Sequence, residues 1–94
     1  MDKISEEKLK KYFKITEEAL VMVKDKGFDE KRKKEAEDFY DMAYRYYSDA
    51  HHFYKNNDYV NAFAAVNYAH GWLDAGARLG LFDVCHDSEL FTVD

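Results

Sequence analysis

Four polar side chains in the segment 59–82 stand at spacings that bring them onto one face of a helix. They are Asn67, His70, Asp74 and Arg78, which are three, four and four residues apart. A histidine one turn from a carboxylate can act as a base that the carboxylate orients, or the two groups can bind a metal ion together. Because a metal site usually needs three or more protein groups, this polar strip predicts no metal.

The polar strip has two interpretations. It can be a polar or anion-binding patch beside Gly71, where the missing side chain lets a ligand approach the backbone. It can also be structural, with Asp74 and Arg78 as an ordinary i,i+4 ion pair worth roughly a few tenths of a kcal/mol and His70 at the edge. We favour the structural interpretation because it requires no ligand.

A second candidate site is Arg45 with His52 on the preceding helix, with His51 beside it. An Arg followed by a His after five or six intervening residues resembles the motif of the HEPN helical-bundle nucleases. That resemblance implies an Arg and a His that act on an RNA phosphate across a dimer cleft. Here Tyr46 follows Arg45 where the motif usually has a polar residue, and Arg45 and His52 lie two turns apart on a face predicted to be solvated. A structural interpretation is favoured for this pair as well.

Two further sets of residues are interpreted as structural. The run 30–35 holds four basic residues in a row, a pattern that can contact phosphates, but acidic residues flank it and it surrounds the start of a helix. Tyrosines can stack on nucleic-acid bases. Most of those between positions 40 and 59 fall on a predicted core arc, where a buried ring leaves its hydroxyl at the rim. Tyr44, at the edge of this arc, is predicted to be exposed.

The composition predicts one helical domain, residues 1–94. Aromatic residues make up 17% of the chain, which argues against disorder. The chain has no prolines and only four glycines, so little interrupts its helices. The net charge of −5 is carried by residues 39–94, and an acidic surface disfavours nucleic acid because affinity for phosphates comes from Lys and Arg. The single Cys85, the charged N-terminus and the lack of a long apolar run predict a cytoplasmic protein that does not enter a membrane.

Apolar periodicity predicts three helices, at about 6–26, 30–55 and 59–80, followed by an irregular tail at 83–94. Ser5 and Asp29 are the expected N-caps of the first two helices, and Gly27 is expected to end the first. Connections of two or three residues make sequential helices antiparallel neighbours. The predicted fold class is therefore all-α, an up-down-up three-helix bundle with a short irregular C-terminal tail.

Packing between the second and third helices is predicted from complementary patterns. The second helix presents a ridge of large aromatics with three alanines along its middle, Ala36, Ala43 and Ala50. The third helix carries a stripe of small residues that lets another helix approach closely: Ala62, Ala65, Ala69, Gly76 and Gly80. We expect the aromatic ridge to set into this stripe.

The third helix also has apolar residues that a free-standing bundle does not need to bury. They are Val60, Ala64, Tyr68, Ala75 and Leu81. Gly71 lies away from the small stripe, so we expect something to come close to it or the helix to bend there. Either the tail or a second copy of the chain covers these residues, and a symmetric dimer is favoured because self-association is a common use of such a patch.

The run YAHGWLDAGARLGLF at Tyr68–Phe82, preceded by NDYVNAFAAV, is not a generic helix string. Together these runs resemble domain of unknown function family 357, an archaeal family of short helical proteins. The resemblance covers the whole length loosely, and its specific part is residues 57–84. It implies a three-helix bundle, an archaeal source and no established activity, and it brings no catalytic residues with it.

The function favoured at this point is a small cytoplasmic, non-catalytic protein-interaction or structural module. A homodimer or an unidentified protein is the expected partner, and no cofactor, metal or membrane is expected. The alternative is a nucleotide- or RNA-binding or RNA-processing helical bundle that uses the His/Asp/Arg polar strip.

Overall fold

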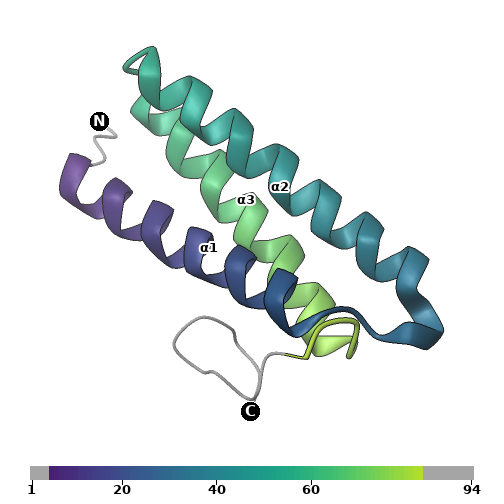
Figure 1. The fold of residues 1–94 in the computed structure, drawn as a ribbon. Coiled ribbons are helices and arrows are strands. Elements are labelled where there is room, and N and C mark those ends of the chain that lie inside the picture. Colours follow the sequence, from purple (N-terminus) through teal and green to yellow (C-terminus); the bar gives the residue numbers. More distant parts are fainter. Residues whose placement is uncertain (1–4, 84–94) are drawn as a thin grey trace.

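Three helices form an antiparallel bundle in the computed structural model, which describes residues 5–83 (Figure 1). They are α1 (Glu6–Lys26), α2 (Lys33–Lys55) and α3 (Tyr59–Arg78), with one 3₁₀ turn, η1 (Glu30–Arg32), before α2. The predicted all-α, three-helix architecture is confirmed. The predicted tail lies, beyond Asp83, outside the described residues. In the described part, no helix is long and apolar enough to cross a membrane.

The ends of α1 are where the capping residues predict them. The Ser5 hydroxyl accepts a hydrogen bond from the Lys8 backbone N–H at 3.1 Å, which satisfies one of the donors that a helix start leaves unpaired. At the other end Gly27 has a φ of 87°, and its N–H donates to the Val23 carbonyl at 3.1 Å. Glycine adopts this positive φ without the steric cost that a Cβ would bring.

The start of α2 differs from the prediction. Asp29 does not cap an α-helix with its side chain; the chain first makes the turn η1, and α2 begins at Lys33. The reason is a long-range contact, because the Asp29 N–H donates to the Leu81 carbonyl at 2.9 Å and Phe28 forms an isolated antiparallel bridge with Phe82. This contact holds the backbone at Asp29 in an extended conformation, so the helix starts later.

The end of α3 is a Schellman motif built on Gly80. Gly80 has a φ of 76°, its N–H donates to the Ala77 carbonyl at 3.1 Å, and the Leu81 N–H donates to the Gly76 carbonyl at 2.9 Å. The prediction that Gly80 belongs to the small-residue packing stripe is therefore wrong. Its role is to reverse the chain direction directly after α3.

This reversal folds two large side chains back onto the bundle. Leu81 and Phe82 are only 2% and 3% exposed. A Cβ built at Gly76 would lie well inside 3 Å of the Phe82 ring, so Gly76 is where that ring packs against α3. The expectation that helix 2 is the partner of Gly76 is corrected, because the atoms nearest to a Cβ built there belong to the Phe82 ring. Leu81 is buried within the single chain, so it needs no second copy to cover it.

The closest helix pair is α2 with α3, and alanines lie at its centre. Ala36, Ala43 and Ala50 are fully buried, one every seventh residue along α2. Aromatic residues of α2, among them Phe53 and Tyr54, pack against the cluster that contains Ala62 and Ala65 of the small stripe. Other rings of α2 contact rings of α3. Phe39 meets the Trp72 ring at 5.1 Å, and Tyr46 meets the Tyr68 ring at 4.5 Å.

The backbone of α1 lies closer to α3 than to α2, and large side chains bridge the wider gap to α2. Figure 1 shows α3 lying between the other two helices. The residues that α1 turns inward follow helical periodicity, and each of them is buried: Leu9, Phe13, Thr16, Leu20 and Val23. At the end of the bundle where α1 begins, the Tyr54 hydroxyl of α2 donates to the Glu6 carboxylate at 2.6 Å and links the two helices.

The contact between Gly76 and Phe82 predicts that Gly76→Ala destabilises the protein by about 1–3 kcal/mol, because the added methyl displaces a buried ring. This loss is expected even though Ala is the better helix former by about 1 kcal/mol. Urea denaturation measures it. The same substitution should cost less in a Phe82→Leu background, where the smaller side chain leaves room. Equal costs in the two backgrounds would contradict the contact.

The link between Tyr54 and Glu6 predicts a pH-dependent stability. Their hydrogen bond raises the pKa of Tyr54 to about 12 and lowers the pKa of Glu6 from its ordinary value. The raised Tyr54 pKa contributes stability below pH about 10 that is lost between pH about 10 and 12. The lowered Glu6 pKa contributes stability above its ordinary pKa of 4.5, and this is lost as the pH falls through and below that value.

The matched variant is Tyr54→Phe, which keeps the ring against Phe13 and Tyr59 but removes the hydroxyl. Urea titrations across the pH range should show the wild type more stable than this variant between pH about 5 and 10. The difference should shrink on either side of that window. A difference that does not change with pH would show that the hydroxyl acts without Glu6.

Candidate functional site

The polar strip of α3 divides into two pairs. His70 and Asp74 turn toward α1 and are mostly covered, with side chains 20% and 21% exposed. The His70 Nδ1 lies 3.3 Å from the hydroxyl of Thr16 on α1, and its Nε2 lies 3.9 Å from the Asp74 carboxylate. Thr16 itself is only 1% exposed, so its contact with His70 joins α3 to α1 at a mostly covered position.

The geometry of His70 favours a structural role over a catalytic one. With its proton on Nε2, directed at Asp74, the ring leaves Nδ1 free to accept the Thr16 hydroxyl proton, and the buried hydroxyl is then paired. Burying a hydroxyl without a partner would cost about 1–3 kcal/mol. Among the residues that the structure describes, no group of three or more His, Cys, Asp or Glu side chains could hold a metal ion.

The other two members of the polar strip are exposed. The Asn67 side chain donates to the Phe63 carbonyl of its own helix at 3.0 Å. Arg78 is in the last turn of α3, where a cation is favoured by the helix dipole. The four residues thus share one side of α3, as predicted. His70 contacts α1 with Asp74 beside it, while Asn67 and Arg78 face outward.

The pair Arg45 and His52 is on the exposed side of α2. The Arg45 guanidinium is held by Asp41 on the preceding turn, with Nε 2.9 Å from the carboxylate. Asn56 donates to the His52 backbone carbonyl at 2.9 Å, and its amide lies 3.5 Å from the His52 ring. These local contacts account for both side chains within their own helix.

The neighbouring histidine, His51, is also exposed, but its ring makes contacts that the sequence pattern did not single out. Its ring lies 4.5 Å from Phe13 on α1 and 4.7 Å from Tyr47 on α2. These three rings line a shallow hollow of about 300 Å³ between α1 and α2. Burial, with a further effect of the Glu17 carboxylate, raises the pKa of Tyr47 to about 12. The position of His51 at the edge of the aromatic arc was the signal for this contact.

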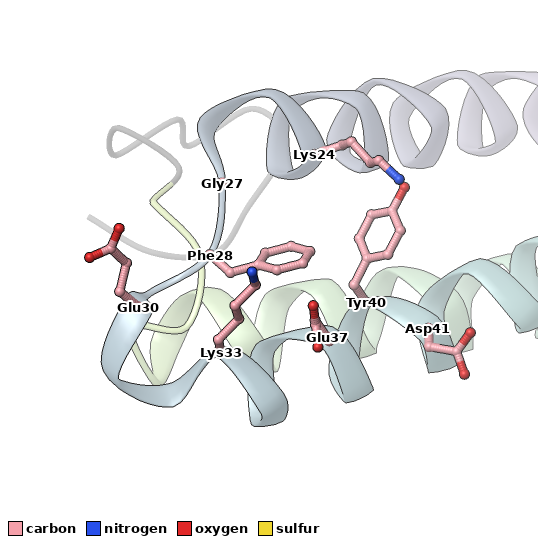
Figure 2. Close-up of a pocket in the computed structure, with 8 residues that line it drawn as sticks. All are labelled: Lys24, Gly27, Phe28, Glu30, Lys33, Glu37, Tyr40 and Asp41. Atoms are coloured by element: carbon pink, nitrogen blue, oxygen red, sulfur yellow. The ribbon is translucent and has the colours of Figure 1, made fainter.

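A second hollow, of about 600 Å³, opens between α1 and α2 at the other end of the groove (Figure 2). Two rings form part of its wall, Phe28 and Tyr40, with centroids 5.7 Å apart. The Lys24 ammonium reaches over the Tyr40 ring at 5.5 Å from its centroid, and burial raises the pKa of that tyrosine. Because lysines and carboxylates both line the hollow, it has no strong preference for an anion or a cation.

The basic run before and at the start of α2 and the tyrosine at the edge of its aromatic arc are exposed, as predicted. The four basic residues at positions 31–34 are all exposed, and the Arg32 Nε lies 3.4 Å from the Asp29 carboxylate. Tyr44 is 54% exposed, as its place at the edge of the arc predicts. Its ring stacks on Tyr40 at 6.4 Å, so it extends the aromatic wall of the second hollow outward.

An apolar row on one side of α3 is left uncovered by the bundle. Val60, Tyr68 and Leu79 are 50%, 54% and 54% exposed. Between them stand three small residues, of which two are exposed and Ala75 is half-buried. We call these six residues the outer row: Val60, Ala64, Tyr68, Gly71, Ala75 and Leu79. A Cβ at Gly71 would meet no atom within 4 Å, so the row borders open space there.

The contact between His70 and Thr16 predicts an energetic coupling between α3 and α1. Thr16→Val and His70→Ala should each destabilise the protein, and the double variant should lose about 1 kcal/mol less than the sum, because one hydrogen bond is removed by either change. Urea denaturation of the four proteins measures this coupling. Thr16→Ser, which keeps the hydroxyl, should retain the coupling with His70. Additive losses for Thr16→Val would show that the two groups do not interact.

The comparison with known families agrees with the helical signature. The family model described as protein of unknown function (DUF357) matches residues 11–82, from the first turns of α1 to Phe82. No curated protein and no solved structure matches the chain. The matched region includes all of α2 and α3 and the two residues that return onto the bundle. The chain belongs to the DUF357 family of proteins of unknown function.

Proposed function

We propose that this protein is a non-catalytic interaction module that presents the outer row of α3 to another protein chain. The observation that carries the proposal is the exposure of three large apolar side chains on one side of a single helix, each of them about half-exposed. Single exposed apolar residues are common on protein surfaces. A contiguous row of them is typical of an interaction site.

The charge pattern of α3 supports this proposal. No Asp, Glu, Lys or Arg occurs between Tyr59 and Leu73, although 35% of the whole chain is charged. A solvated helix face normally carries charged residues opposite its apolar face. Depletion of charge is characteristic of the centre of a protein interface. The outer row therefore has the composition of a surface that is covered when the protein functions.

The two candidate sites with catalytic residue types give less support to an enzyme. Arg45 is paired with Asp41, and His70 is engaged by the buried Thr16 hydroxyl. RNA processing is therefore not the function proposed. We further propose a cytoplasmic location, which is supported by the single cysteine in the sequence.

The proposal predicts that protein capture depends on the outer row. A tagged full-length chain is incubated with an extract of the source organism, and the retained proteins are identified. Ala64→Glu puts a charge in the middle of the row at an exposed helical position, where it should not unfold the helix. We expect at least one protein, which can be the untagged chain itself, to be retained by the wild type and lost with Ala64→Glu.

Val21→Glu is the matched control, because Val21 is 56% exposed on α1 and does not belong to the row. This variant should retain the same proteins as the wild type. Circular dichroism checks that both variants remain helical. If the wild type and both variants retain the same set, or if none retains any protein, the proposed function is wrong.

A further inference from the structure

We draw no further inference here: the strongest candidate, the apolar outer row on one side of α3, already carries the proposed function, and nothing in the structure shows which chain covers it.

Discussion

Alanines at every seventh position of α2 let this helix lie directly against α3, and the arrangement of the remaining parts follows from that close contact. Because Ala36, Ala43 and Ala50 occupy the line of closest approach, the aromatic rings of α2 are displaced to either side of it. On one side the rings of α2 contact rings of α3: Phe39 packs against Trp72, and Tyr46 packs against Tyr68. On the other, Tyr47 and Tyr54 meet Phe13 and form the wall against which α1 packs.

The position of α3 between two helices also explains why one of its sides is left uncovered. Its buried residues are divided between α2 and α1, and the chain ends its helical part with Leu81 and Phe82 folded against the same end of the bundle. The large members of the outer row remain about half-exposed. A three-helix bundle with an apolar central helix therefore leaves one side of that helix uncovered.

Sequence patterns within a single helix were sufficient to predict the features that depend only on residues close in the chain, such as helix ends and buried faces. Ser5, Gly27 and the buried face of α1 follow from capping chemistry and helical periodicity, and the structure confirms them. Contacts between distant residues could not be read in this way. The bridge between Phe28 and Phe82 delays the start of α2, and the Schellman turn at Gly80 sends Phe82 onto Gly76. The polar strip was likewise recognisable as one side of a helix, but only the packing shows that His70 turns to Thr16.

The central claim is that the outer row is the surface through which this chain binds another protein chain, and backbone amide chemical shifts test it most directly. Spectra of the ¹⁵N-labelled chain are recorded before and after the addition of unlabelled extract of the source organism. The account predicts that the amide signals of Ala64, Tyr68 and Gly71 shift or broaden while that of Val21 on α1 does not. Spectra that do not change, or changes confined to the residues of α1 and α2 around His51, would contradict it.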